Sequence, residues 1–420
     1  MTDNDTIQSP RIATLRQELE AGNSSALDAF WREVAEKGAP LFEPVEGDKQ
    51  QMLVTFLWRG DEETHNVVIL GGLAGWDDLK NQQMTRLLES DLWYRTYRGD
   101  RTLRTTYRLS VNDSFEPLTE ENWLEREAGW RHDPLNPRTF LFPKDEEDPN
   151  DRAFLVSVLE LPGAPPQPYT TPRDGVPAGT LEMHRLHSKL LENERRVWIY
   201  TPPGYSSEGE PYGLFVVFDG LAYIEMVPAP VILDNLLAEG KIPPLLTVLI
   251  DSLLHEARSR ELPCHQPFVD FLTTELLPWV RERYHVTTDP TRTIVGGSSY
   301  GGLASAFAAL RAPEVFGNAL SQSGSFWWKP EEASEHEWLA RQYVLTPRLP
   351  LRFYLDVGLR EDGPTPDNGP PQVVVNRHMR DVLQAKGYLV QYAEFMGGHD
   401  YICWRGTLAD GLLALLSKNS

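Results

Sequence analysis

The sequence has few of the features that mark secreted or membrane-spanning proteins. Only two of its 420 residues are cysteines, Cys264 and Cys403, which is too few for a disulfide framework and is typical of a reducing compartment. Its longest apolar runs, such as 245–250, fall well short of the ~18 residues that suggest a membrane span. The N-terminal residues show no basic region followed by an apolar stretch, so we expect no secretory signal and a cytoplasmic location.

Positive charge is also scarce. Forty Lys and Arg residues stand against 61 Asp and Glu residues, and the formal net charge of −21 disfavours a nucleic acid as partner. A small anionic ligand is still allowed, because a pocket can gather arginines against the global sign. The apolar content of 41% argues against a largely disordered chain, and the length predicts two or three domains.

The N-terminal part of the chain changes its hydrophobic period near residue 50. Residues 10–40 have apolar side chains at helical spacing and predict a helical hairpin, which defines an N-terminal helical segment over 1–45. Beyond it, alternating β-branched and aromatic residues predict antiparallel strands at 51–59, 65–72, 92–100 and 104–111. We therefore expect a β-sandwich domain over 46–160.

A proline-rich segment separates this region from the rest of the chain. Residues 161–179 contain six prolines and predict a semi-extended linker. From 180 to 420, short apolar runs alternate with amphipathic stretches such as 267–284 and 372–388. Apolar strands that alternate with helices predict an α/β domain whose mostly parallel sheet is covered on both faces.

The strongest local signal is a G-x-S-x-G motif formed by Gly297, Ser299 and Gly301. It follows an apolar strand directly and precedes a helix-like stretch, which is the context of a nucleophile elbow. The tight turn would lift the hydroxyl of Ser299 above the sheet edge, whereas Ser298 has the wrong register. Ser299 is therefore the candidate nucleophile, and the backbone N–H of Tyr300 is a candidate oxyanion donor.

A serine needs an adjacent base, and α/β-hydrolases place their residues in the order serine, acid, histidine. His399 fits this order, because it lies in a glycine-containing loop between a strand-like segment and the final helix. His378 falls within a predicted helix and His336 in an acidic, surface-like stretch, so both are weaker candidates.

The acid should lie between the serine and the histidine in sequence. Glu361 and Asp362 come just after the predicted strand 352–358, where such an acid is expected, whereas Asp356 is still inside that strand. Position alone favours Glu361 and leaves Asp362 open.

A second oxyanion donor normally follows an early strand. Residues 215–220 are predicted to form that strand, so the N–H groups of Gly220 and Leu221 are the candidate donors. Asp219 is interpreted as a turn residue.

Two arginines suggest an anionic substrate. Arg258 and Arg260 follow a central strand, at the sheet edge where open α/β folds bind ligands, and guanidinium groups can pair with anions and stack on aromatic rings. The competing interpretation is a solvated cluster paired with Glu256 and Glu261. Further candidates for substrate contact, which could equally be core or surface residues, are Trp327, Trp328, Trp404 and Arg405.

From about residue 51 to 418 the chain resembles the ferric enterobactin (enterochelin) esterases, a family of esterase D-like α/β-hydrolases. The resemblance rests on motifs such as GWRHDPLNP, RSRELPC, VGGSSYGGLASAFAAL and GLRE, and most specifically on SQSGSFWW and GGHDYICWRG. It implies an N-terminal immunoglobulin-like sandwich and a C-terminal α/β-hydrolase domain. It also implies Ser299 as nucleophile, His399 as base, Glu361 as acid and Arg258 as a residue that holds the catecholate.

The function implied by this resemblance is hydrolysis of the ester bonds of a catecholate trilactone siderophore, carried as its iron complex. We expect no cofactor and no protein metal site, since no histidine–carboxylate cluster has metal-ligand spacing. One alternative is a broad carboxylesterase or feruloyl-type esterase on the same scaffold. Another, of a different class, is a siderophore- or glycan-binding protein. The oligomeric state is left open.

Overall fold

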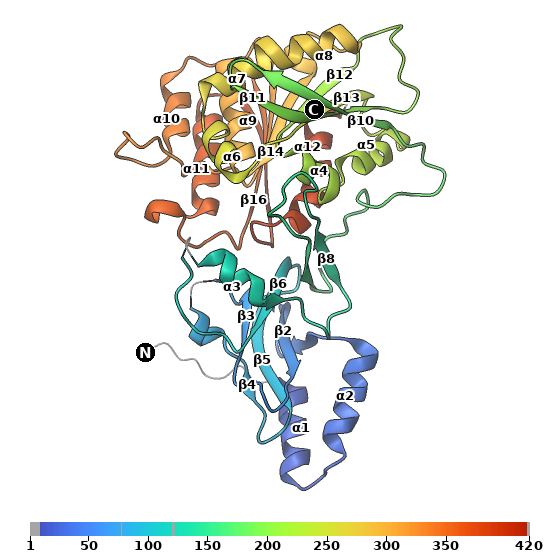
Figure 1. Cartoon of the computed structure of the whole chain (residues 1–420), viewed down its shortest axis with the longest axis vertical. Helices are drawn as coiled ribbons and strands as arrows, with labels where there is room; N and C mark the ends of the chain where they lie inside the picture. Colours follow the sequence, from blue (N-terminus) through green and yellow to red (C-terminus); the bar gives the residue numbers. More distant parts are fainter. Residues whose placement is uncertain (1–8, 77, 120–121, 418–420) are drawn as a thin grey trace. The chain divides into compact units, whose positions relative to one another are not determined.

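The computed structural model describes residues 9–76, 78–119 and 122–417, which fall into two compact units, Met1–Pro165 and Pro166–Ser420 (Figure 1). The division lies inside the proline-rich segment 161–179 that the sequence predicts as a linker. Of the predicted helical segment 1–45, residues 1–8 lie outside the described residues, as do 418–420 of the predicted catalytic domain. Within the described ranges, every helix is too short or too polar to cross a membrane.

The first unit begins with the two predicted helices, α1 (Pro10–Glu20) and α2 (Ala26–Lys37). The Ser9 hydroxyl accepts the N–H of Ile12 at 3.1 Å, which caps the first turn of α1. The apolar faces of both helices join one buried cluster with side chains from the neighbouring strands, including Leu57 and Leu92. The hairpin is therefore part of the core of this unit.

Two antiparallel sheets form the rest of the first unit. One has the order β1-β2-β5-β4 and contains β1 (Leu41–Val45), β2 (Asp48–Arg59), β4 (Thr85–Arg86) and β5 (Leu92–Asp100). The other has the order β3-β6-β9-β8 with β7 paired to β6, and contains β3 (Val67–Gly71), β6 (Arg104–Val111), β7 (Trp130–Arg131), β8 (Thr139–Phe142) and β9 (Phe154–Glu160). The short helices η1 (Leu79–Gln82) and α3 (Trp123–Gly129) complete the unit.

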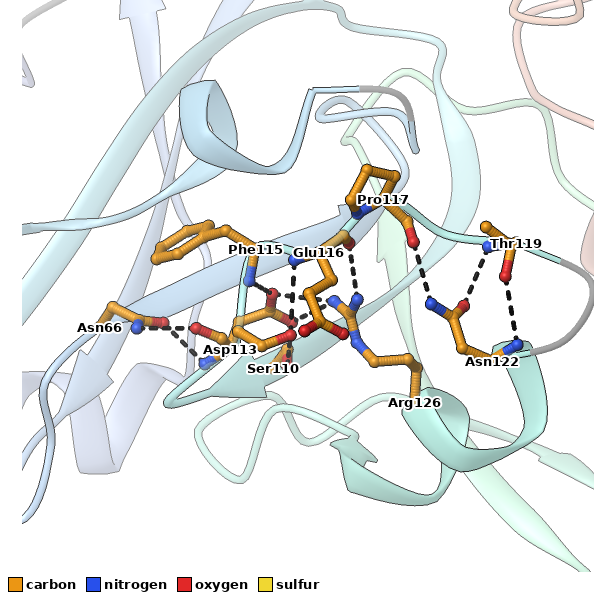
Figure 2. Close-up of polar contacts among 10 residues, drawn as sticks. Asn66, Ser110, Asp113, Phe115, Glu116, Pro117, Thr119, Asn122 and Arg126 are labelled. Atoms are coloured by element: carbon orange, nitrogen blue, oxygen red, sulfur yellow. Dashed lines mark hydrogen bonds and ion pairs between the residues drawn. The ribbon is translucent and has the colours of Figure 1, made fainter.

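A buried ion pair anchors α3 to the loop that follows β6 (Figure 2). The carboxylate of Asp113 receives Nη2 of Arg126 at 2.8 and 2.9 Å, and the two side chains are only 1% and 11% exposed. The same carboxylate accepts the Ser110 hydroxyl at 2.7 Å and the Phe115 N–H at 2.7 Å. The Asn66 side chain pairs with the Asp113 backbone in both directions. This loop is therefore held by a buried ion pair and hydrogen bonds, in addition to the packing of Phe115 and Leu118 on a buried apolar cluster.

One eight-stranded sheet is the centre of the second unit, in the order β10-β11-β13-β12-β14-β15-β16-β17. The first two pairings are antiparallel and the remaining five are parallel. The strands are β10 (Thr180–Ser188), β11 (Asn193–Thr201), β12 (Gly213–Val217), β13 (Leu245–Ile250), β14 (Thr293–Ser298), β15 (Asn318–Gln322), β16 (Arg352–Gly358) and β17 (Leu389–Phe395). The sequence did not predict β10, because this edge strand is largely exposed and mixes His, Arg and Glu with its apolar residues.

Helices cover this sheet through two large apolar clusters, and both contain side chains from the central strands. The helices are α4 (Gly220–Glu225), α5 (Ala229–Ala238), α6 (His255–Glu261), α7 (Gln266–Phe271), α8 (Leu277–Arg283), α9 (Tyr300–Arg311), α10 (Trp338–Leu345), α11 (Gln372–Ala385) and α12 (Tyr401–Leu416). The helix expected over 267–284 contains a π turn at Leu272–Leu276 just before Pro278, which lacks the N–H of a regular helix.

The register of the parallel strands brings their carboxyl ends together. Ser298 at the end of β14 is paired with Gln322 at the end of β15, and Gln322 is paired with Asp356 near the end of β16. On the other side of β14, Val217 at the end of β12 lies opposite Gly296. The loops that follow these strands therefore meet at one edge of the sheet, where open α/β folds bind their ligands.

Candidate active site

Ser299 occupies a strained turn between β14 and α9. Its φ of 58° and ψ of −121° are unusual for a non-glycine residue, and such strain is typical of a nucleophile elbow. A Cβ on Gly297 would lie 2.9 Å from the backbone of Gly301, so no side chain fits there. Ser298 is buried, whereas Ser299 is partly exposed. The turn therefore presents Ser299 at the sheet edge, as the motif predicts.

His399 and Glu361 form a short polar contact between side chains of two different loops at this edge. His399 lies between β17 and α12, Glu361 lies three residues after β16, and Nδ1 of the histidine is 2.6 Å from Oε2 of the glutamate. The Arg360 N–H donates to the Gly397 carbonyl at 2.9 Å, which ties the two loops together. Gly358 is required here, because a Cβ on it would lie 2.5 Å from the Gly397 oxygen.

The Glu361 carboxylate is buried and almost fully hydrogen-bonded. Its side chain is 3% exposed, and its second oxygen, Oε1, accepts the Ser323 hydroxyl at 2.6 Å and the Gly358 N–H at 2.8 Å. Asp362, the alternative acid, has an exposed side chain. The structure thus brings Glu361, and not Asp362, to the histidine.

The Ser299 hydroxyl is turned away from the histidine. Its Oγ lies 3.3 Å from Oγ of Ser325, and among the described residues it makes no hydrogen bond to His399. A serine side chain changes rotamer freely when it is partly exposed, and catalytic hydrogen bonds often tighten only when substrate is bound. The imidazole is 42% exposed, so its other nitrogen, Nε2, is open to approach.

Asp356 lies beneath this pair as a second buried carboxyl. It is 0% exposed, and burial raises its pKa to about 8. Below that pH Asp356 is therefore neutral and adds no second negative charge beside the pair of His399 and Glu361. A single carboxylate beside the imidazole is what a histidine base requires.

The loop after β12 contains Gly220 and Leu221, the candidate oxyanion donors, at the start of a helix. Asp219 has a left-handed backbone, φ 57°, and α4 starts at Gly220. A Cβ on Gly220 would lie 2.8 Å from the backbone of Leu249, so glycine is required at this position too. Gly220 and Leu221 therefore open a helix directly beside the elbow, and Tyr300 is the first residue of α9.

Arg258 makes a two-pronged ion pair with Asp219. Its Nε and Nη2 donate to the two carboxylate oxygens at 2.6 and 2.8 Å, and its guanidinium lies 5.7 Å from the ring centre of Tyr300. Asp219 is thus a charge partner as well as a turn residue, which the sequence analysis missed. The guanidinium is 22% exposed, and among the described residues its Nη1 makes no hydrogen bond.

The other two candidate arginines differ in their surroundings. Arg260 is 63% exposed and approaches only its neighbour Glu261, at 3.5 Å, so it matches the interpretation as a solvated charge. Arg405 is partly buried and its Nε donates to Gln167 Oε1 at 2.7 Å.

The three candidate tryptophans also differ in their burial and neighbours. Trp327 is 8% exposed and its ring centre lies 5.9 Å from that of Tyr300. Trp328 is partly buried against Trp338. Trp404 is 3% exposed, and its indole N–H donates to Ser323 rather than facing outward. Only the first of the three lies next to the elbow.

The two weaker histidine candidates lie elsewhere. His378 contacts Glu337 on the exposed side of α11, and Nδ1 of His336 lies 3.0 Å from the backbone carbonyl of Trp327. Among the residues that the structure describes, no group of three or more His, Cys, Asp or Glu side chains is arranged to hold a metal ion.

Comparison with known proteins finds an esterase family match in each of the two units. The model of a family described as "Putative esterase" matches residues 188–415, and that of "Enterochelin esterase, N-terminal" matches residues 53–170. The chain is 32% identical to an iron(III) enterobactin esterase of Dickeya dadantii (strain 3937), over 97% of this chain and 96% of the relative. It is 30% identical to an iron(III) salmochelin esterase of Escherichia coli O6:H1, over 96% of each protein.

Solved structures agree with these sequence matches. The ferric enterobactin esterase of Salmonella typhimurium is 29% identical and superimposes with a TM-score of 0.75, over 92% of this chain and 98% of that one. The enterobactin esterase of Shigella flexneri, crystallised in the presence of enterobactin, is 29% identical with a TM-score of 0.73, over 92% and 97% of the two chains.

Proposed function

Because the chain belongs to the family of iron(III) enterobactin esterases, we propose that it hydrolyses the ester bonds of a catecholate trilactone siderophore and so releases iron. The observation that carries this proposal is the 2.6 Å contact between His399 and Glu361 beside a strained elbow serine. These residue types, in this chain order, are those of a serine hydrolase with an α/β-hydrolase fold.

In the proposed mechanism Ser299 rotates from Ser325 towards Nε2 of His399, which accepts its proton as the hydroxyl attacks a lactone carbonyl. Glu361 accepts the Nδ1–H, fixes the tautomer and stabilises the imidazolium. The oxyanion is held by the N–H of Tyr300 and that of Gly220 or Leu221, and removal of one such donor typically costs about 100–1,000-fold in rate.

The same histidine completes the reaction. His399 returns its proton to the leaving serine hydroxyl of the siderophore backbone, and the acyl group stays on Ser299. His399 then activates a water molecule that hydrolyses the acyl-enzyme. Every step uses side chains of this chain, and the iron travels with the substrate.

A local cation is needed for the substrate, since a ferric triscatecholate is a trianion and the chain carries −21. Arg258 is the best candidate. Although Asp219 accepts hydrogen bonds from Nε and Nη2, Nη1 makes no hydrogen bond to a described residue, and the guanidinium can also stack on a catechol ring. Trp327, packed near Tyr300, is the aromatic neighbour proposed to contact the same ligand.

The first unit is proposed to be an immunoglobulin-like sandwich made by its two antiparallel sheets. The family match over residues 53–170 supports this assignment. A cytoplasmic location is proposed with it, on the low cysteine content of the sequence.

The test is incubation of the purified protein with ferric and with iron-free enterobactin, followed by mass spectrometry of the products. We expect linear and then monomeric 2,3-dihydroxybenzoyl-serine fragments, and none with Ser299→Ala. A broad carboxylesterase would instead favour simple aryl esters over the triscatecholate. A pure binding protein would leave the trilactone intact.

A further inference from the structure

We propose that Ser323 and Trp404 are positioning residues that hold the Glu361 carboxylate and the His399 imidazole in their mutual orientation. The inference rests on the proposed function, since it concerns two side chains behind the proposed acid. Ser323 is 0% exposed and Trp404 is 3% exposed, so neither side chain can contact a substrate. Their influence on the reaction must pass through Glu361 and His399.

A directed chain of hydrogen bonds links the two residues to the acid. The indole N–H of Trp404 donates to Oγ of Ser323 at 3.1 Å, and the Ser323 hydroxyl donates to Oε1 of Glu361 at 2.6 Å. An indole can only donate, so it occupies a lone pair of the serine oxygen and leaves the single hydroxyl proton for Glu361. Donors to a carboxylate favour its charged form.

The same indole also touches the base. The ring centres of Trp404 and His399 lie 4.8 Å apart with planes at 85°, an edge-to-face contact that limits rotation of the imidazole. Trp404 is itself held, because its backbone carbonyl accepts the Gln322 side-chain amide at 2.8 Å. One buried side chain thus contacts the imidazole directly and Glu361 through Ser323.

Loss of this chain changes the charge state of the acid–base pair. Without the Ser323 hydroxyl, the Glu361 carboxylate loses the hydrogen bond that Ser323 donates to Oε1 at 2.6 Å. The negative charge is then less shared, which favours the imidazolium of His399. This change moves the acid limb of the kcat/KM profile to higher pH.

The experiment compares Ser323→Ala and Trp404→Phe with Ser188→Ala. Ser188 is an equally buried serine of the same unit that donates to the Glu275 carboxylate at 2.6 Å, far from the elbow in sequence. We expect Ser323→Ala to lower kcat by about 10–100-fold, with KM changed by less than about twofold. Its acid limb should move up by about one pH unit. Ser188→Ala should change none of the three.

Trp404→Phe replaces the bicyclic indole by a smaller phenyl ring, so it removes the N–H donor to Ser323 together with part of the packing against His399. We expect a smaller change than that of Ser323→Ala, in the same direction. The double variant should be only slightly worse than Ser323→Ala, because the indole N–H acts on the acid through the serine and only the ring contact with His399 is lost in addition. If Ser323→Ala does not fold, kcat and the acid limb of the kcat/KM profile of Trp404→Phe test the positioning role.

Unchanged kcat and unchanged acid limbs in the folded variants would overturn this inference. An equal effect of Ser188→Ala would do so too, since it would show a general response to a lost serine–glutamate bond. Ser299→Ala distinguishes failure of the proposed function from failure of the positioning role. If Ser299→Ala still hydrolyses the siderophore, the proposed function itself is wrong. If it is inactive while Ser323→Ala is normal, only the positioning role fails.

Discussion

Each of the two units buries a hydrogen-bonded carboxylate, and the two clusters differ in their cation. In the first unit Asp113 is paired with Arg126, which is 11% exposed (Figure 2). In the second unit Glu361 is paired with His399, which is 42% exposed. Serine hydroxyls and backbone N–H groups complete both shells.

The cation paired with each carboxylate determines whether the pair can exchange a proton with a substrate. Arginine stays protonated at any accessible pH, so the Asp113 pair can only hold its loop in place. Histidine gains and loses a proton near neutral pH and is reachable by solvent, so the Glu361 pair can move a proton to and from a substrate. We therefore expect changes in the second cluster to alter rates and changes in the first to alter stability.

The largest expected effect is removal of the nucleophile or the base. Ser299→Ala and His399→Ala should each lower kcat for siderophore hydrolysis by about 10⁶-fold, and the double variant should be little worse because the residues act as a unit. Steady-state kinetics with product detection by mass spectrometry measures this. Retention of more than about a tenth of the wild-type rate by either single variant would reject the assignment.

The acid is expected to come second. Glu361→Gln should lower kcat by about 10⁴-fold, since glutamine cannot hold the histidine tautomer or stabilise the imidazolium. Asp362→Asn is the matched control and should stay near wild type, because its side chain is exposed. The reverse ranking in a kinetic comparison would move the acid by one residue.

Arg126→Met tests the other side of the comparison. It leaves the Asp113 carboxylate buried without its cation, which should lower the free energy of unfolding of the first unit by about 3–5 kcal/mol. Urea unfolding measures this loss, and kcat for p-nitrophenyl acetate on folded protein should stay unchanged. A variant with normal stability and impaired turnover would contradict the division of roles between the clusters.

Much of this arrangement follows from the sequence, because motif order reflects topology. The elbow at Ser299, the late His399 and an acid just after 352–358 were all placed by the strand–loop–helix pattern. The choice between Glu361 and Asp362 needed coordinates, since adjacent loop residues point in different directions.

Contacts between residues far apart in sequence could not be predicted. The pairing of Asp219 with Arg258 spans 39 residues, and that of Trp404 with Ser323 spans 81. Trp404 therefore looked as suitable for substrate contact as for the core. No sequence motif singled out Ser323. Its one signal was its position directly after β15, which ends at the same sheet edge.

A smaller effect is expected at Arg258, which shares the permanent charge of Arg126 but lies at the catalytic edge. Arg258→Met should raise KM for the ferric siderophore about tenfold or more, while kcat/KM for neutral p-nitrophenyl acetate stays near wild type. Arg258→Lys keeps the charge but loses the planar guanidinium, so its KM for the ferric siderophore should lie between that of wild type and that of Arg258→Met. Equal losses on both substrates would assign Arg258 to bracing the Asp219 loop, and the anion site would move to Arg405 or Arg260.

Asp356→Asn is expected to have the smallest effect on activity. Asparagine resembles the protonated carboxyl, so kcat at pH 7 should change by less than about twofold. Burial holds the pKa of Asp356 at about 8, above that of an unfolded aspartate, so the folded wild type loses stability as the pH rises between these values. Thermal unfolding should show the variant gaining relative to wild type from about pH 4 to pH 8. A difference that does not depend on pH would contradict this assignment.

The most direct test of the central claim is to find which serine carries the acyl group. Ser299 and Ser325 have hydroxyl oxygens only 3.3 Å apart, so chemistry at this edge could in principle use either. The protein would be mixed with enterobactin, quenched within the first turnover, digested and mapped by peptide mass spectrometry, with Ser325→Ala as a parallel sample. We predict that in both proteins Ser299 carries the ring-opened linear trimer of 2,3-dihydroxybenzoyl-serine, because attack on one ester of the cyclic trilactone leaves the other two intact. An adduct on Ser325, or continued hydrolysis of the siderophore by Ser299→Ala, would contradict the account.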